Sequence, residues 1–304
     1  MISAAPGLGN SPGLDQPPFL TQNRRLQACR NAATEVGIRS RFGVYRRIFK
    51  SLSYTSPMPQ LLVSVRNLRE ALLAHSSGVA IIDLKEPAAG SLGNVDPVLR
   101  DEIVRQLQTQ SIGQRPPLLS VALGELWDHV GQAGQTTELS QLDGFRFAKI
   151  GLANGRSLDD WRTDWLSFVH SLPPETLPVA AAYADAAAAG APEPEEVLEF
   201  ALEYSLQVFL LDTWSKTQGN LFQVLSQERL EHLRQQAAGR ITFALAGSLS
   251  LDCEPQLRQL QPEIVAIRGD VCLAGRNSPL SAERLELWKT LVSQLSGHTA
   301  HGQS

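Results

Sequence analysis

Short apolar segments alternate with helix-like segments along the chain from Met58 onward. Three of the helix-like segments start at typical helix-capping signals: Asp96 followed by Pro97, Ser226 and Ser281. Eight of the apolar segments have the length and composition of buried strands. They are LLVSV (61–65), VAIIDLK (79–85), LLSVAL (118–123), FRFAKIGL (145–152), LPVAAAY (177–183), QVFLLDT (207–213), ITFALAG (241–247) and EIVAIRG (263–269).

The order of these segments predicts the fold class. Eight successive βα units in roughly 240 residues match the size and order of an α/β protein built as a (β/α)8 TIM barrel. A doubly wound open sheet is the main alternative, but no G-x-G-x-x-G follows the first strand. We therefore predict a barrel domain over residues 58–297, followed by a short tail at 298–304.

Ionisable residues stand at the ends of several predicted strands. In a (β/α)8 barrel the carboxyl ends of the strands and the loops after them build the active site. The residues that would meet there are Asp83, Lys85, Lys149, Asp185, Asp212, Lys216 and Arg268. Their position predicts a site for chemistry at one end of the barrel.

Lysine is scarce in this chain, which has five lysines and 22 arginines, and three of the lysines stand at strand ends. A lysine in a low-dielectric site can lose its proton near neutral pH and attack a carbonyl group, whereas arginine stays protonated. Each lysine alone could simply pair with a neighbouring carboxylate. The three together, Lys85, Lys149 and Lys216, favour imine chemistry on an aldehyde or ketone.

The loops after the seventh and eighth strands contain small residues, in AGSLS (246–250) and RGDVCLAGR (268–276). Small residues let backbone N–H groups approach an anion, and barrels often bind phosphate in these two loops. We therefore predict a phosphorylated small-molecule substrate, bound by Asp185, Gly247, Ser248, Arg268 and Gly269. The histidines lie outside the strand ends, and no His, Cys and carboxylate cluster has metal-ligand spacing, so we predict no metal and disfavour a metal hydrolase.

Composition excludes several other classes of protein. The chain of 304 residues is 43% hydrophobic and 19% charged, with a net charge of −4 and no basic stripe, so nucleic-acid binding is not indicated. No apolar run is long enough to cross a bilayer, which argues against a membrane protein. Three scattered cysteines suit neither a disulfide framework nor a zinc site and indicate a reducing, cytoplasmic setting.

The first 57 residues differ in kind from the rest. They contain eight Lys or Arg residues against Asp15 and Glu35, and they open with a stretch rich in Gly and Pro. This composition predicts a disordered or dispensable extension, or a mis-assigned start, before the globular sequence that begins at Met58. A transit peptide is an alternative for an Arg-rich, acid-poor leader.

Seven motifs along the predicted barrel resemble those of one enzyme family. They are LLVSVRN, IIDLKEPAAGSLG, AKIGLA, VAAAYAD, LLDTWSK, ALAGSL and IRGDVC. Together they resemble (5-formylfuran-3-yl)methyl phosphate synthase, also called 4-(hydroxymethyl)-2-furancarboxaldehyde-phosphate synthase, of methanofuran biosynthesis. The resemblance covers about residues 60 to 295, and IIDLKEPAAGSLG is its most specific motif.

The resemblance implies a homo-oligomeric barrel that uses no cofactor. The enzyme would condense two molecules of glyceraldehyde 3-phosphate and release phosphate and water to give a phosphorylated furan aldehyde. Carried over by position, the Schiff-base lysine is Lys85 and the acid/base lysine is Lys149. The resemblance assigns supporting roles to Asp83, Asp212 and Lys216.

Two positions depart from the family pattern. The family usually shows Lys-Asp-Gly after the sixth strand, whereas KTQG follows DTWS here, which puts Lys216 in question. Asp270 stands where a small residue is common, and its charge would be unfavourable near a phosphate unless the side chain turns away or Arg268 or Arg276 compensates.

Two other functions fit the same residues. One is another imine-forming lyase of the aldolase type, acting on a different phosphorylated sugar. The other is a non-catalytic barrel that binds a phosphorylated metabolite, although phosphate binding alone would not require three lysines at strand ends.

Overall fold

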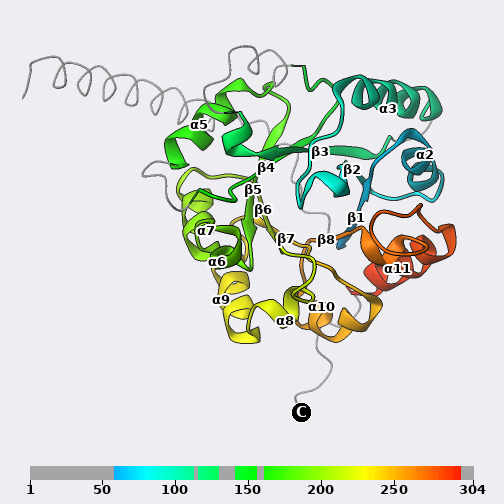
Figure 1. Cartoon of the computed structure of the whole chain (residues 1–304). Helices are drawn as coiled ribbons and strands as arrows, with labels where there is room; N and C mark the ends of the chain where they lie inside the picture. The colour runs from blue at the N-terminus through cyan, green and yellow to red at the C-terminus, as the bar shows by residue number, and fades with distance from the viewer. Residues whose placement is uncertain (1–57, 113–115, 130–140, 156–160, 296–304) are drawn as a thin grey trace, which may run out of the picture.

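A computed structural model describes residues 58–112, 116–129, 141–155 and 161–295 of the chain. The strands close into a parallel barrel in chain order, because β1 pairs with both β2 and β8 (Figure 1). The eight strands are β1 (Gln60–Val65), β2 (Ile81–Leu84), β3 (Leu118–Glu125), β4 (Phe147–Gly151), β5 (Leu177–Tyr183), β6 (Val208–Asp212), β7 (Thr242–Leu245) and β8 (Ile264–Ile267). The predicted (β/α)8 fold is confirmed, and each apolar segment predicted as a strand overlaps one observed strand.

Helices surround the barrel on the outside (Figure 1). In the described residues they are α2 (Leu68–Ser76), α3 (Pro97–Gln110), α5 (Trp161–Ser171), α6 (Ala186–Ala189), α7 (Pro194–Glu203), α8 (Leu221–Val224), α9 (Gln227–Ala237), α10 (Glu254–Leu260) and α11 (Ala282–Gln294). Single 3₁₀ turns lie at Pro87–Ala89, Leu126–Asp128, Leu251–Cys253 and Gly269–Val271.

The predicted helix starts are also confirmed. The Asp96 carboxylate accepts hydrogen bonds from the first amides of α3, at 3.0 and 3.2 Å. The hydroxyls of Ser226 and Ser281 each accept the amide three residues later, at the starts of α9 and α11. These side chains satisfy amides that the helix itself leaves without partners.

Strand residues alternate between the barrel interior and the helix layer. Strand register places Ser64, Asp83 and Ser120 side by side, and it places Lys149 beside Ala122. Because neighbouring positions in register share one face of the sheet, these residues belong to the same interior set. Polar side chains in a barrel core are costly unless they are paired, so this set marks the position of a site.

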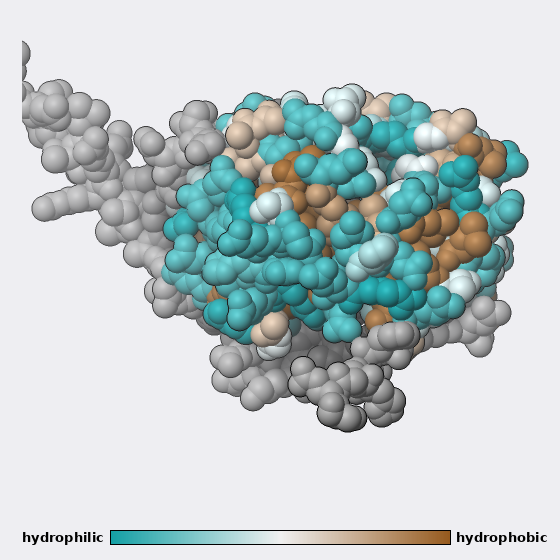
Figure 2. Space-filling view, turned by 90° about the horizontal axis from the view of Figure 1, so that it is seen from below, coloured by the Kyte–Doolittle hydropathy of each residue, from teal (hydrophilic) through white to brown (hydrophobic). Residues whose placement is uncertain are grey.

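The proposed domain boundaries remain predictions. Residues 1–57 and the tail at 298–304 lie outside the described residues. Among the described helices, none is both long and apolar enough to span a membrane. Figure 2 shows one face of the molecule, on which hydrophilic residues predominate and apolar residues form a few smaller areas.

Candidate active site

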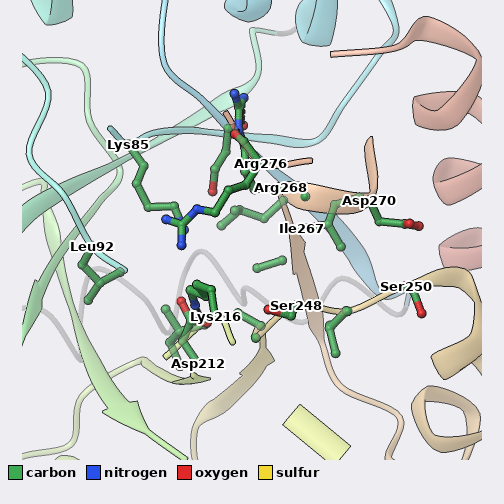
Figure 3. A pocket seen from close by; sticks show the side chains of 18 of the residues that line it. Lys85, Leu92, Asp212, Lys216, Ser248, Ser250, Ile267, Arg268, Asp270 and Arg276 are labelled. Atoms are coloured by element: carbon green, nitrogen blue, oxygen red, sulfur yellow. Dashed lines mark hydrogen bonds and ion pairs between the residues drawn. The ribbon is translucent and has the colours of Figure 1, made fainter. Parts of the chain in front are cut away.

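A cavity of about 320 Å³ opens at the carboxyl ends of the strands (Figure 3). Its volume is at the lower end of the range for small-molecule sites. It brings together most of the site residues predicted from the sequence. Of these, the lining includes Lys85, Lys149, Asp212, Lys216, Gly247, Ser248, Arg268 and Gly269.

Lys149 on β4 forms a buried ion pair with Asp83 on β2. The Lys149 Nζ atom lies 2.6 Å from Asp83 Oδ1, and both side chains are almost fully buried. The other carboxylate oxygen of Asp83 accepts the Ser64 hydroxyl from β1 at 2.8 Å. Asp83 itself does not line the cavity. The hydrogen bond from Ser64 orients the Asp83 carboxylate, and the ion pair with that carboxylate fixes the position of Lys149.

Lys216 forms a second ion pair, with Asp212 at the end of β6. Its Nζ atom lies 2.9 Å from Asp212 Oδ1 and also contacts the Thr213 carbonyl oxygen. The Ser91 hydroxyl donates to Asp212 Oδ2 at 3.1 Å. Lys216 therefore occupies the cavity although the residues that follow it differ from the family pattern.

Lys85 differs from the other two lysines. Within the part of the chain that the structure describes, its ammonium group contacts no carboxylate, although the side chain is buried. Burial, together with the positive charges of Lys216 and Lys149, lowers the pKa of Lys85 from 10.5 to about 8, against the opposing pull of Asp212 and Asp83. Desolvation and like charges both disfavour the ammonium form.

Asp212 has the opposite balance. Burial alone would raise the pKa of its carboxyl group, but Lys216, Lys85 and the Thr213 amide stabilise the carboxylate and lower that pKa from 3.8 to about 2. The carboxylate therefore stays ionised at neutral pH. It remains a fixed negative charge between two lysines.

The loop after β2 crosses the mouth of the barrel. Besides its bond to Asp212, the Ser91 hydroxyl contacts the Thr213 carbonyl oxygen at 2.9 Å, so this loop is tied to β6 on the other side of the cavity. A side chain at Gly93 would place its Cβ atom 2.2 Å from the Glu86 carbonyl oxygen. This close approach gives a physical reason for the small residues in IIDLKEPAAGSLG.

The loop after β7 has the backbone shape expected for anion binding. Gly247 and Ser248 both have positive φ, 102° and 50°, and a side chain at Gly247 would place its Cβ atom 2.8 Å from Thr213 Cγ2. Among the described residues no acceptor contacts the amides of Ser248 and Gly269, both of which line the cavity. Unpaired amides beside small residues can bind an oxyanion.

Two predicted substrate-binding residues have internal partners. Arg268 on the β8 side is buried and forms an ion pair with Glu70 of α2. Asp185 does not line the cavity. Its carboxylate accepts the amides of Trp214 and Ser215 at 2.6 and 2.7 Å, and it therefore orders the loop that carries Lys216.

Asp270 belongs to the cavity lining, but its carboxylate points away from the cavity (Figure 3). Its Oδ2 atom accepts the indole N–H of Trp288 on α11 at 2.8 Å, and Oδ1 lies 3.9 Å from an Nη1 atom of Arg284. The unusual negative charge is thus directed at the helix layer. On the basis of the sequence, we expect the charge of Asp270 to be tolerated if its side chain turns away from the phosphate, and the side chain does turn away from the cavity.

Sequence reasoning missed a pair at the ends of β3 and β5, formed by the buried Tyr183 and the partly buried Glu125. The Tyr183 hydroxyl donates to Glu125 Oε1 at 2.7 Å, and Glu125 Oε2 accepts the Ala153 amide at 2.7 Å. Burial, and then the Glu125 carboxylate, raise the pKa of Tyr183 well above 10.0. Gly151 makes room for the pair, because a Cβ atom there would lie 2.2 Å from Glu125 Oε2.

Ser64 and Ser91 were also missed. The alternation along β1 could have placed Ser64 in the interior, because Leu62 and Ser64 share one face. The contact between Ser91 and Asp212 spans 121 residues, so no local pattern predicts it. The structure shows no group of His, Cys, Asp or Glu within its described ranges that could hold a metal ion.

Comparisons with known proteins agree on one family. A family model described as 4-HFC-P synthase matches residues 61–289. The (5-formylfuran-3-yl)methyl phosphate synthase of Methanothermobacter thermautotrophicus is 32% identical over 219 residues, which is 71% of this chain and 90% of that protein. The enzyme of the same name from Methanopyrus kandleri is 33% identical over 221 residues, or 71% and 91% of the two chains.

Solved structures support the fold. The 3-hexulose-6-phosphate synthase of Salmonella typhimurium has a TM-score of 0.50 at 14% identity and covers 78% of this chain and 98% of its own. The thiamine phosphate pyrophosphorylase of Pyrococcus furiosus has a TM-score of 0.51 at 13% identity, with coverages of 79% and 97%. At these identities the likeness concerns the barrel fold alone.

Proposed function

The chain belongs to the 4-HFC-P synthase family, and on this premise we propose that it condenses two molecules of glyceraldehyde 3-phosphate into (5-formylfuran-3-yl)methyl phosphate. The atoms balance when one inorganic phosphate and two waters leave. The enzyme would be a carbon–oxygen lyase of methanofuran-type biosynthesis that uses a lysine Schiff base. From the same resemblance we infer a homo-oligomer that needs no cofactor, and from the few scattered cysteines we infer a cytoplasmic setting.

One observation carries the proposal: of the three lysines in the cavity, Lys85 is the one without a carboxylate in contact among the described residues. A Schiff base requires a neutral amine. With a pKa of about 8, roughly a quarter of the Lys85 side chains are neutral at a pH of about 7.5, against about one in a thousand for a lysine with the ordinary pKa of 10.5. The other two lysines each form an ion pair, Lys149 with Asp83 and Lys216 with Asp212.

The charges in the cavity fit this assignment. When Lys85 is neutral, the three lysines and their two aspartates carry no net charge, because Lys149 pairs with Asp83 and Lys216 pairs with Asp212. Attack by Lys85 Nζ on an aldehyde forms the C=N bond and releases water. The positive imine acidifies the adjacent carbon, which then can add to a second aldehyde.

Lys149 and Lys216 would supply the proton transfers that follow. Condensation, loss of phosphate and dehydration each need a donor or acceptor near the reacting carbons, and both ammonium groups line the cavity with Lys85. The amides of Ser248 and Gly269 would hold a phosphate group. Binding energy from that phosphate positions the carbons for bond formation.

The test is an assay for a furan chromophore from glyceraldehyde 3-phosphate alone, with borohydride added in parallel samples during turnover. We expect furan formation without a second substrate and a reduced adduct on Lys85 by peptide mapping. A Lys149→Arg variant should still form the adduct while furan formation falls. An adduct without furan would indicate a different imine-forming lyase, and the absence of both would refute the proposal.

A further inference from the structure

Two arginines from the region after β8 line the cavity, but they differ in their partners. Arg268 uses its whole guanidinium group inside the protein. It contacts both carboxylate oxygens of Glu70 and donates to the carbonyl oxygens of Ser64, Arg276 and Ser278, at 3.0, 2.8 and 3.3 Å. Arg268 therefore has few donors left for a ligand.

Arg276 is held in place by Arg268 but is itself largely unpaired. Its backbone carbonyl accepts the Arg268 Nε–H, while its own guanidinium donates through Nη2 to the Gly90 carbonyl oxygen at 2.8 Å. In the described part of the chain no carboxylate contacts this guanidinium, and no second acceptor does. Four of the five N–H donors of an arginine thus remain available.

The side chain reaches into the cavity toward the side on which Lys85 lies (Figure 3). It is half-buried. Burial and the charge of Arg268 lower the pKa of Arg276, and Asp212 and Glu86 offset this only partly. A half-buried cation with unused donors is unfavourable by itself, and an anion beside it would relieve the cost.

We propose that Arg276, oriented by the Gly90 carbonyl, binds the phosphate group of a phosphorylated substrate on the β2 side of the cavity. This rests on the proposed function for the identity of the substrate but not for the presence of the site. The planar guanidinium can bind two phosphate oxygens at once. The unpaired amides of Ser248 and Gly269 lie in the loops after β7 and β8, so a second phosphate group could bind there.

The experiment titrates inorganic phosphate into the full chain by calorimetry and compares it with an Arg276→Gln variant. Loss of a charge-assisted hydrogen bond should weaken phosphate binding by about tenfold or more. Arg258→Gln is the matched control: Arg258 pairs with Glu254 at 2.6 Å outside the cavity, so its variant should bind phosphate unchanged. Undetectable binding to the unmodified chain, or equal binding by Arg276→Gln, would overturn the proposal.

A second, kinetic experiment tests whether Arg276 binds the phosphate group of a substrate and not only free inorganic phosphate. The ratio of kcat/KM for glyceraldehyde 3-phosphate to that for unphosphorylated glyceraldehyde should fall by about tenfold in Arg276→Gln. An unchanged ratio would overturn the role in substrate binding. If no furan is formed at all, the proposed function fails, while the phosphate titration still decides the role of Arg276.

Arg276→Lys covers the case in which the Gln variant does not fold. It keeps the charge but loses the planar fork. Its phosphate affinity should be lower than that of the unmodified chain. Affinity equal to that of the unmodified chain would exclude the two-point contact on which the proposal depends.

Discussion

The barrel contains two buried charged clusters that solve the same physical problem differently. On the β8 side, Arg268 and Glu70 are both buried and satisfy each other. In the cavity, three lysines meet Asp83 and Asp212, and Lys85 has no carboxylate in contact within the described chain. Removing charges from water is costly in both places, and only in the first cluster does every charge have a partner in contact.

Under the proposed function, the first cluster has a supporting role and the second is the reactive one. A saturated ion pair resists changes in protonation, because each partner stabilises the charged form of the other. A surplus lysine does the opposite, since its pKa is lowered and a neutral amine becomes accessible. Residues at neighbouring strand ends can therefore have unrelated roles, and their partners show which role each one has.

The largest expected effect comes from Lys85→Arg. Arginine keeps the positive charge but cannot form an imine, so furan formation should fall by about a thousandfold or more while the fold survives. Turnover and thermal melting would be measured together. Lys289→Arg is the control, because Lys289 pairs with Glu286 on the surface of α11. If Lys85→Arg retained activity, Lys85 would have only a supporting role and would not form the imine.

The converse change is Glu70→Gln, which leaves Arg268 as a buried cation without its carboxylate. Breaking a buried pair costs about 3 to 5 kcal/mol, and the free energy of unfolding in urea should fall by that order. Glu254→Gln breaks the more exposed pair with Arg258 and should cost about 1 kcal/mol or less. If Glu70→Gln lost activity but kept its free energy of unfolding, the pair of Glu70 and Arg268 would serve the reaction and not the stability of the fold.

The sequence predicted the fold well because the relevant signals are local. Strand length, apolar runs and caps such as Asp96 and Ser226 depend on neighbouring residues, and each predicted strand was found. Barrel closure then follows from the number of βα units. The lysines and their aspartates could be placed at one end for the same reason.

The partners of the site residues could not be predicted in this way. Arg268 and Arg276 look alike in RGDVCLAGR, yet Glu70 of α2, about 200 residues away, occupies one of them and leaves the other available. Asp185 was predicted to bind substrate, and no sequence pattern indicated that its carboxylate accepts the amides of Trp214 and Ser215. Whether a polar side chain already has partners inside the protein depends on contacts between distant segments, which no local sequence pattern encodes.

A smaller effect should appear in the pH dependence. Lys85 has a lowered pKa of about 8, and its proposed role is that of the neutral amine, so kcat/KM should rise by about tenfold per unit below pH 8 and level off above it. Lys216→Met removes one ammonium group that lowers this pKa and frees Asp212, which raises it. The inflection should therefore move to higher pH in the residual activity. An inflection that moves lower or does not move would contradict the assignment.

The smallest effect is expected at Asp270, whose carboxylate faces the helix layer and neither of the two clusters. Its carboxylate accepts the Trp288 indole N–H, and an asparagine oxygen could accept the same bond. Asp270→Asn should therefore change KM by less than about twofold, because the lost charge faces α11 and not a phosphate. Asp270→Ala removes the acceptor of a buried donor and should lower the free energy of unfolding by about 1 kcal/mol or more with KM still unchanged. A KM for glyceraldehyde 3-phosphate that drops severalfold in both variants would show that the charge repels the substrate, and would place Asp270 within reach of the phosphate after all.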